Sequence, residues 1–218
     1  MELVDRVRAD LRAVADPSRA AGQRVYMKSA MPFLGVRVPE ARRIARSAAK
    51  GESDADVLRR ASRALWDDAQ HREERYAAQA LVALRPLRGD LSNIPLIEHM
   101  VRTGQWWDFV DELTGRVAEL HDRHPKETAD LARRWSRDPD VWMRRLAILS
   151  QLRRRDRTDF RLLDDVIAPN ATEREFFIRK AIGWALRDAA RTDPDWVRRC
   201  VDRHGLSSLS RREALKHL

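Results

Sequence analysis

One stretch of the chain decides the fold class: residues 173–191 read EREFFIRKAIGWALRDAAR. Its apolar residues recur at spacings of three and four, as on the buried face of an α-helix. This apolar face consists of Ile178, Ala181, Ile182, Ala185, Leu186 and Ala189. A second face carries Phe177, Lys180, Trp184, Arg187 and Arg191. The stretch therefore predicts an amphipathic helix with one core face and one face that alternates aromatic and basic residues.

The same helical pattern runs through the rest of the chain, where glycine and proline are scarce, at 8 and 9 of 218 residues. No run alternates β-branched residues in the manner of a strand, so we expect no sheet. No stretch has the composition of a linker, so we expect a single domain over residues 1–218. The predicted helices span 2–15, 18–29, 39–50, 53–66, 71–85, 93–103, 106–121, 125–136, 139–153, 158–167, 173–191, 194–203 and 210–217.

Several helix starts carry local signals. A proline at the first helical position is expected after Asp16, Val38, His124, Asp138 and Asp193. The segments Thr172–Glu175 and Ser210–Glu213 have the spacing of capping boxes, which predicts that Thr172 and Ser210 cap their helices.

A weak internal repeat indicates how the helices are organised. Trp107, Trp142 and Phe177 are spaced 35 residues apart. Repeats of this length with two helices each are typical of HEAT-like α–α superhelices, which present a long concave face. An irregular all-helical domain would also fit the pattern, and the sequence leaves that alternative open.

Charge limits the classes of partner. The net charge is +9 and the isoelectric point about 10.6, which favours a polyanion: nucleic acid first, an acidic membrane surface second. No apolar run is long enough to span a membrane. Cys200 is the only cysteine and the six histidines show no metal-binding spacing, so we expect no metal, no cofactor and a reducing cytoplasm.

A candidate cation site lies in the segment Trp106-Trp107-Asp108-Phe109-Val110-Asp111. On a helix Trp107 and Asp111 share a face, which puts an aromatic ring beside a carboxylate. A packed Trp107 with a solvated Asp111 is the plainer interpretation. In a surface built for phosphate, a carboxylate is either paired to an arginine or has a chemical role.

One such role is to stabilise a sugar cation. Glycosidic cleavage passes through an oxocarbenium-like state, which a nearby carboxylate stabilises while it orients water. We find no second carboxylate at a suitable spacing to protonate the leaving group. A single acid suffices when the leaving base is already cationic, as an N3- or N7-alkylated purine is.

Taken together, these motifs resemble the AlkD-type DNA alkylation repair family of HEAT-repeat alkylpurine DNA glycosylases. The segments that carry the resemblance are spread in order over nearly the whole chain. They are Val25–Lys28, Phe33–Val36, Trp106–Asp111, Trp142–Leu149, Phe176–Arg187 and Leu209–His217.

The resemblance implies specific roles for residues of this chain. Asp111 would stabilise the sugar cation and position water, between aromatic walls formed by Trp107 and Trp184. Tyr26, Arg145 and Arg187 would hold the DNA backbone near the lesion. The lesion would be processed while still stacked, without the base flipping that is usual for glycosylases. The aromatic–basic pattern adds Lys180, Trp142 and Phe177 as DNA-binding residues.

These expectations amount to a monomeric bacterial enzyme that acts in the cytoplasm, with the nucleoid, on double-stranded DNA containing alkylated purines. Two other functions stay open: a non-catalytic helical-repeat protein that binds damaged or branched DNA, and a protein-binding adaptor. Trp66, Trp135 and Trp196 are expected to pack between helices rather than bind a ligand.

Overall fold

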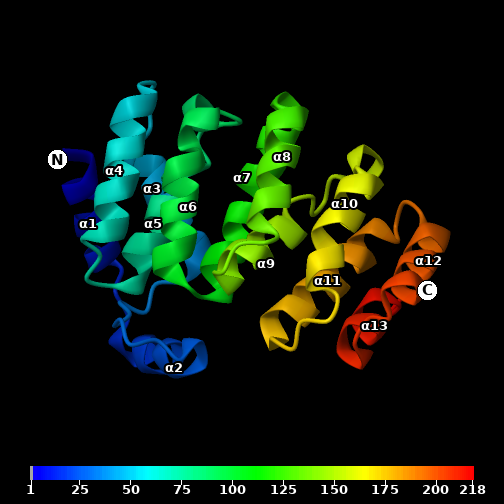
Figure 1. Ribbon diagram of the computed structural model, residues 1–218. Coiled ribbons are helices and arrows are strands. Elements are labelled where there is room, and N and C mark those ends of the chain that lie inside the picture. Colours follow the sequence, from blue (N-terminus) through cyan, green and yellow to red (C-terminus); the bar gives the residue numbers. More distant parts are fainter. Residues whose placement is uncertain (1) are drawn as a thin grey trace. The chain divides into compact units, whose positions relative to one another are not determined.

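The computed structural model describes residues 2–218 and is entirely helical, with no strand in that range (Figure 1). This confirms the all-α prediction, and every predicted helix appears with its ends within four residues of the expected positions. The α-helices are α1 (Glu2–Ala13), α2 (Pro17–Met27), α3 (Val38–Ala48), α4 (Ala55–Asp67), α5 (Arg72–Val82), α6 (Ile94–Gly104), α7 (Trp107–Arg123), α8 (Pro125–Trp135), α9 (Val141–Leu149), α10 (Phe160–Ile167), α11 (Phe176–Ala189), α12 (Pro194–His204) and α13 (Ser208–Ala214). Short 3-10 turns follow α5, precede α6 and flank α10.

Proline marks four of the five helix starts where it was expected, but not that of α9. Pro17, Pro125 and Pro194 are the first residues of their helices, and Pro39 is the second residue of α3. Pro139 instead lies two residues ahead of α9, because the Asp140 carboxylate caps that helix and accepts the Trp142 N–H at 2.8 Å. A side-chain cap satisfies an otherwise unpaired donor, so it determines where the helix begins.

Both predicted capping boxes are wrong. The carboxylate of Glu175, not Thr172, caps α11, and the hydroxyl of Ser207, not Ser210, caps α13. Ser210 lies inside α13, fully buried, and donates its hydroxyl to the Arg179 carbonyl at 3.1 Å. Ser210 is therefore used in the contact with α11 and does not cap α13.

The described chain forms two compact units that divide within α6, between Leu96 and Ile97. In the first unit, α1, α3, α4 and α5 pack around a core that includes Leu11, Leu65 and Trp66. The single domain over 1–218 stays a prediction. Among residues 2–218, none of the helices is both long and apolar enough to cross a membrane.

The second unit contains α7 to α13 and nearly all of the candidate site residues. Figure 1 shows α11 and α13 side by side in this unit, and they form its most extensive helix–helix contact. Trp135 is buried and donates its indole N–H to Glu98 at 2.6 Å, and Trp196 packs on Phe160 with ring centroids 4.8 Å apart. With the fully buried Trp66 of the first unit, these residues confirm the predicted packing role of the three tryptophans.

A buried carboxylate holds the loop between α2 and α3. Glu73 is fully buried and accepts the backbone N–H groups of Leu34, Gly35 and Val36 at 2.9, 2.9 and 3.1 Å. Three charge-assisted hydrogen bonds fix the backbone of this loop. The loop also contacts the start of α2, because the N–H of Asp16, the residue that caps this helix, donates to the Leu34 carbonyl at 2.8 Å.

Gly35 is required in this loop for two reasons. Its φ of +88° lies in the region that favours glycine, and an added Cβ would overlap the carbonyl of Asp16. We expect Gly35→Ala to lower the free energy of unfolding by about 3 kcal/mol or more, measured by urea denaturation. Gly51→Ala is the matched control, with φ +89° but no atom within 4 Å of the added Cβ. It should cost only about 1–2 kcal/mol of backbone strain, and equal losses in both variants would contradict the steric argument.

Candidate functional site

The centre of the candidate site is an ion pair between α7 and α9. Arg145 Nε and Nη2 donate to the two carboxylate oxygens of Asp111, Oδ1 and Oδ2, each at 2.8 Å. The Arg145 side chain is only 2% exposed, whereas the Asp111 side chain is 20% exposed. The predicted catalytic carboxylate is therefore held in a bidentate pair and keeps one edge open to solvent.

The guanidinium of Arg145 also joins these two helices to α11. Its Nη1 donates to the Phe177 carbonyl at 2.6 Å. Its Cζ lies 5.9 Å from the centroid of the Phe177 ring and 5.5 Å from that of Trp184. A buried arginine is tolerated only when its donors are satisfied, and these contacts meet that requirement.

Burial and the ion pair act in opposite directions on Asp111. Loss of solvent raises the pKa of the Asp111 carboxyl, while the hydrogen bonds and charge of Arg145 lower it, and burial prevails. Both oxygens accept from Arg145, which matches an ionised carboxylate. Each oxygen has a second lone pair, so the exposed edge can still face a cation or hold a water molecule.

Trp184 is half-buried between two cations. The Arg145 guanidinium lies 5.5 Å from the ring centroid, and the Lys180 ammonium lies at the same distance. The aromatic–basic face predicted for this helix is thus present at Phe177, Lys180 and Trp184, with Arg145 of α9 added to it.

Sequence reasoning missed the anion that pairs with this face. Glu213 of α13 accepts from Lys180 Nζ and from Arg187 Nη1, each at 3.0 Å. The hydrogen bond from Lys180 is the main cause that lowers the pKa of Glu213 below its usual range, and Arg187 acts in the same direction. The only signal in the sequence is the Ser210–Glu213 spacing, which locally predicts a helix cap. In the structure, two cations predicted to bind DNA are already neutralised by Glu213.

The close approach of α13 to α11 depends on the absence of a side chain at Gly183. A Cβ at this position would overlap Cβ of Glu213 and lie 3.1 Å from the Ser210 carbonyl oxygen. We expect Gly183→Ala to lower the free energy of unfolding by about 2–3 kcal/mol and to loosen the pairs of Glu213 with Lys180 and Arg187. Gly115→Ala in α7, where no atom lies within 4 Å of the added Cβ, should instead stabilise by about 0.5–1 kcal/mol. Thermal and urea denaturation of both variants would measure the difference, and a stabilised Gly183→Ala protein would contradict the close contact.

Three rings from three helix starts form a cluster beside the ion pair. Trp106, Trp142 and Phe177 have centroid separations of 6.1 Å (Trp106–Trp142), 5.7 Å (Trp106–Phe177) and 4.9 Å (Trp142–Phe177). The 35-residue spacing singled out Trp107, but the ring contacts are made by Trp106, the extended residue just before α7. Trp142 is only 7% exposed, which suits packing, whereas Phe177 is half-buried.

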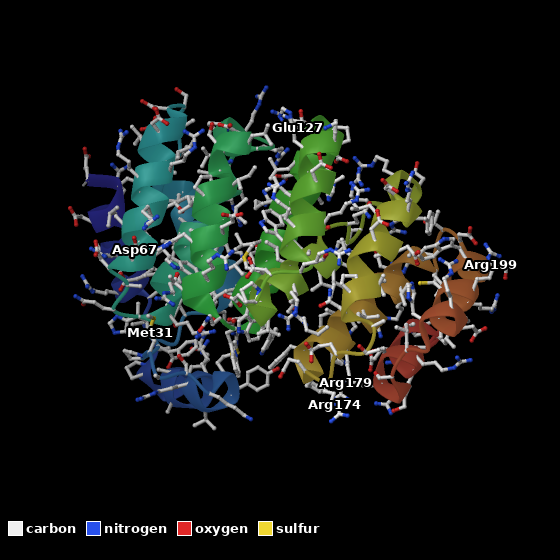
Figure 2. The ribbon with its side chains drawn as sticks, viewed as in Figure 1. Met31, Asp67, Glu127, Arg174, Arg179 and Arg199 are labelled. Atoms are coloured by element: carbon white, nitrogen blue, oxygen red, sulfur yellow. The ribbon has the colours of Figure 1, made fainter. Side chains whose placement is uncertain are left out.

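The remaining predicted residues are placed as follows. Trp107 is the half-buried first residue of α7, one helical turn before Asp111. Tyr26 belongs to the first unit, where it is 75% exposed on α2. Figure 2 labels two further arginines in this region, Arg174 just ahead of α11 and Arg179 within it.

Comparisons with known proteins bear on the family and the fold of the chain. A family model described as DNA alkylation repair enzyme matches residues 7–218. Among solved structures, the chain is similar to a predicted DNA alkylation repair enzyme from Enterococcus faecalis, with 30% identity and a TM-score of 0.86 over 94% of this chain and 96% of that one. No curated protein matches the chain. The similarity in fold supports the expected α–α superhelical architecture. By the extent of the family match, the chain belongs to the DNA alkylation repair enzyme family, which assigns it a role in DNA repair.

Proposed function

We propose that this protein is a DNA glycosylase that releases positively charged N3- and N7-alkylpurines from duplex DNA, as a monomer in the bacterial cytoplasm, by a reaction that uses no metal or cofactor. One observation carries the proposal. Asp111 is fixed by two hydrogen bonds from the buried Arg145 and yet keeps an exposed edge. A fixed carboxylate that needs no reorganisation is suited to stabilising a developing positive charge.

The reaction would proceed as follows. The bond between the sugar C1′ and the base nitrogen breaks, and its electron pair neutralises the positive charge of the alkylated base. Positive charge then develops on the sugar, where the Asp111 carboxylate stabilises it. A water molecule held by the free lone pairs of Asp111 adds to C1′ and loses a proton to solvent. The products are a free alkylpurine and an abasic site.

The surroundings of Asp111 suit a leaving group that departs without protonation. Arg145 touches the carboxylate and carries a fixed positive charge, so it cannot act as a general acid. An N3- or N7-alkylated purine leaves as a neutral base and needs no such acid. Trp107 and Trp184 would contribute the aromatic surfaces that favour a cationic nucleotide.

DNA binding would use the cations and rings of α9 and α11, with Tyr26 of α2 as a further backbone contact. Lys180 and Arg187 would exchange Glu213 for phosphate oxygens, whereas Arg145, which is buried and paired with Asp111, would position that carboxylate rather than bind phosphate. Phe177 and Trp142 belong to the same surface, with Trp142 contributing chiefly by packing because of its burial. If the lesion is processed while it is stacked in the duplex, no protein pocket would enclose the base.

The pairing of Asp111 with Arg145 also supports one alternative, a non-catalytic protein that binds damaged or branched DNA. In that case Asp111 would serve only to satisfy a buried arginine. Incubation with duplex DNA containing 7-methylguanine or 3-methyladenine separates the two functions. Release of free base supports the glycosylase, whereas binding that falls steeply with salt but leaves every base in place supports the alternative. The absence of salt-sensitive binding would support a protein-binding adaptor.

A further inference from the structure

A second cluster of reactive side chains joins α10 to α12 in the second unit. Asp164 Oδ1 lies 2.8 Å from His204 Nε2 and 3.7 Å from Cys200 Sγ. A carboxylate oxygen, a thiol sulfur and an imidazole nitrogen thus lie within 4.8 Å of one another. The cluster shares no residue with the site around Asp111, and the proposed glycosylase chemistry makes no use of it.

Helix geometry explains how this cluster forms. Cys200 and His204 are four residues apart on α12 and therefore lie on one face. Asp164 extends to them from α10, and its second oxygen accepts from Arg203 at 2.9 Å. Neither the histidine spacing nor the single cysteine reveals this pair, because Cys200 and His204 indicate a site only when they are considered together. The third residue is 36 positions away and could be found only in the fold.

We propose that Asp164, Cys200 and His204 bind a zinc ion, with a water molecule as the fourth ligand. These are the three donor types that zinc prefers, and three protein ligands leave one position of a tetrahedron free. A thiolate and a carboxylate together balance the charge of Zn²⁺. The ion would join α10 to α12, and the proposal does not depend on the proposed glycosylase function.

The present separations are close to those that a tetrahedral ion needs. Zinc bonds of about 2.0–2.3 Å place neighbouring donor atoms roughly 3.3–3.7 Å apart. Asp164 and His204 would therefore separate slightly. Arg203 pairs with the other oxygen of Asp164, and its side chain is 51% exposed, so it can remain as an outer partner.

Solvent can reach one side of the cluster. The side chains of Asp164 and His204 are 28% and 13% exposed, so an ion can approach from their side while Cys200 lies beneath, fully buried. Burial, followed by the charge of Asp164, raises the pKa of the Cys200 thiol to about 12, which opposes loss of its proton in the metal-free protein. Zinc binding would then break the S–H bond, form the S–Zn bond and release one proton to solvent.

The experiment compares metal binding by the reduced, chelator-treated full chain with that by variants. Zn²⁺ is titrated against a chromophoric competing chelator, and Co²⁺ is used as a spectroscopic substitute. We expect one bound equivalent and, with Co²⁺, a thiolate-to-metal charge-transfer band. Cys200→Ser and His204→Gln should each weaken binding by at least about tenfold, and Cys200→Ser should abolish the band.

His217→Gln is the matched control, since His217 is an exposed histidine near the end of the chain, and it should bind as the wild type does. Absence of the thiolate band in the wild type, or equal affinity in Cys200→Ser, would overturn the proposal and leave the cluster as a hydrogen-bonded contact. The Co²⁺ spectrum of the wild type decides the question even if a variant fails to fold. DNA is absent throughout, so the outcome is separate from that of the glycosylase test.

Discussion

Asp111→Asn is expected to slow the release of alkylated base from duplex DNA by about 100- to 1,000-fold. The neutral amide removes the charge that would stabilise the sugar cation while leaving the size of the side chain unchanged. Single-turnover release of 7-methylguanine from a defined duplex measures the effect. Affinity for DNA should change by less than about tenfold, because the carboxylate repels phosphate rather than binding it.

Asp130→Asn is the control for this variant. It makes the same change of charge on α8, where the Asp130 side chain is 47% exposed and pairs with Lys126 at 3.3 Å, and it should leave base release unchanged. Retained DNA binding shows that the Asp111→Asn protein is folded. Release at the wild-type rate by folded Asp111→Asn would remove Asp111 from the mechanism.

Arg145→Met is expected to lower the free energy of unfolding by about 3–5 kcal/mol at neutral pH, because it leaves the largely buried Asp111 without its counter-ion. It also removes the hydrogen bond to the Phe177 carbonyl. Urea denaturation measures the loss.

Arg144→Met is the matched control on the same helix. Arg144 pairs with Glu173, which is 33% exposed, at 3.0 Å, so its loss should cost only about 1–2 kcal/mol.

Arg145→Met should also change the pH dependence of base release. The charged form of Asp111 is the active one, so the rate falls as pH drops through its pKa. Burial already raises that pKa above the ordinary 3.8, against the opposing effect of Arg145. Without Arg145 the pKa rises further, and the acid limb of the rate profile should move to higher pH. An unchanged limb, or one moved to lower pH, would contradict the role assigned to the ion pair.

Lower pH slows base release, but it favours the contribution of Asp111 to the stability of the folded protein. When the folded pKa of a carboxyl exceeds the unfolded value, the native state binds the proton more tightly. The contribution of Asp111 to stability is then lost as pH rises through the folded pKa. Arg145→Met should therefore lose less stability, relative to the wild type, as the pH is lowered towards that pKa. Denaturation at two pH values tests this expectation.

The number and positions of the helices followed from the sequence because periodicity is a local property. Apolar residues three and four positions apart bury one face whatever the partner is, and Asp16-Pro17 or Asp193-Pro194 mark helix starts without reference to the rest of the fold. Where a tertiary contact competed with a local signal, the local signal failed, as it did at Ser210. At Pro139 one local signal overrode another, because the Asp140 cap determined where α9 begins.

The candidate site divides in the same way. An all-helical chain and a helix face bearing Lys180, Trp184 and Arg187 were predictable from the sequence, because these features depend on residues a few positions apart. The pairing of Arg145 with Asp111 from 34 residues away, and the neutralisation of Lys180 and Arg187 by Glu213, arise from the packing of the helices. Such pairs depend on which helices meet and at what distance, and buried charge is stable only where a partner is brought to it.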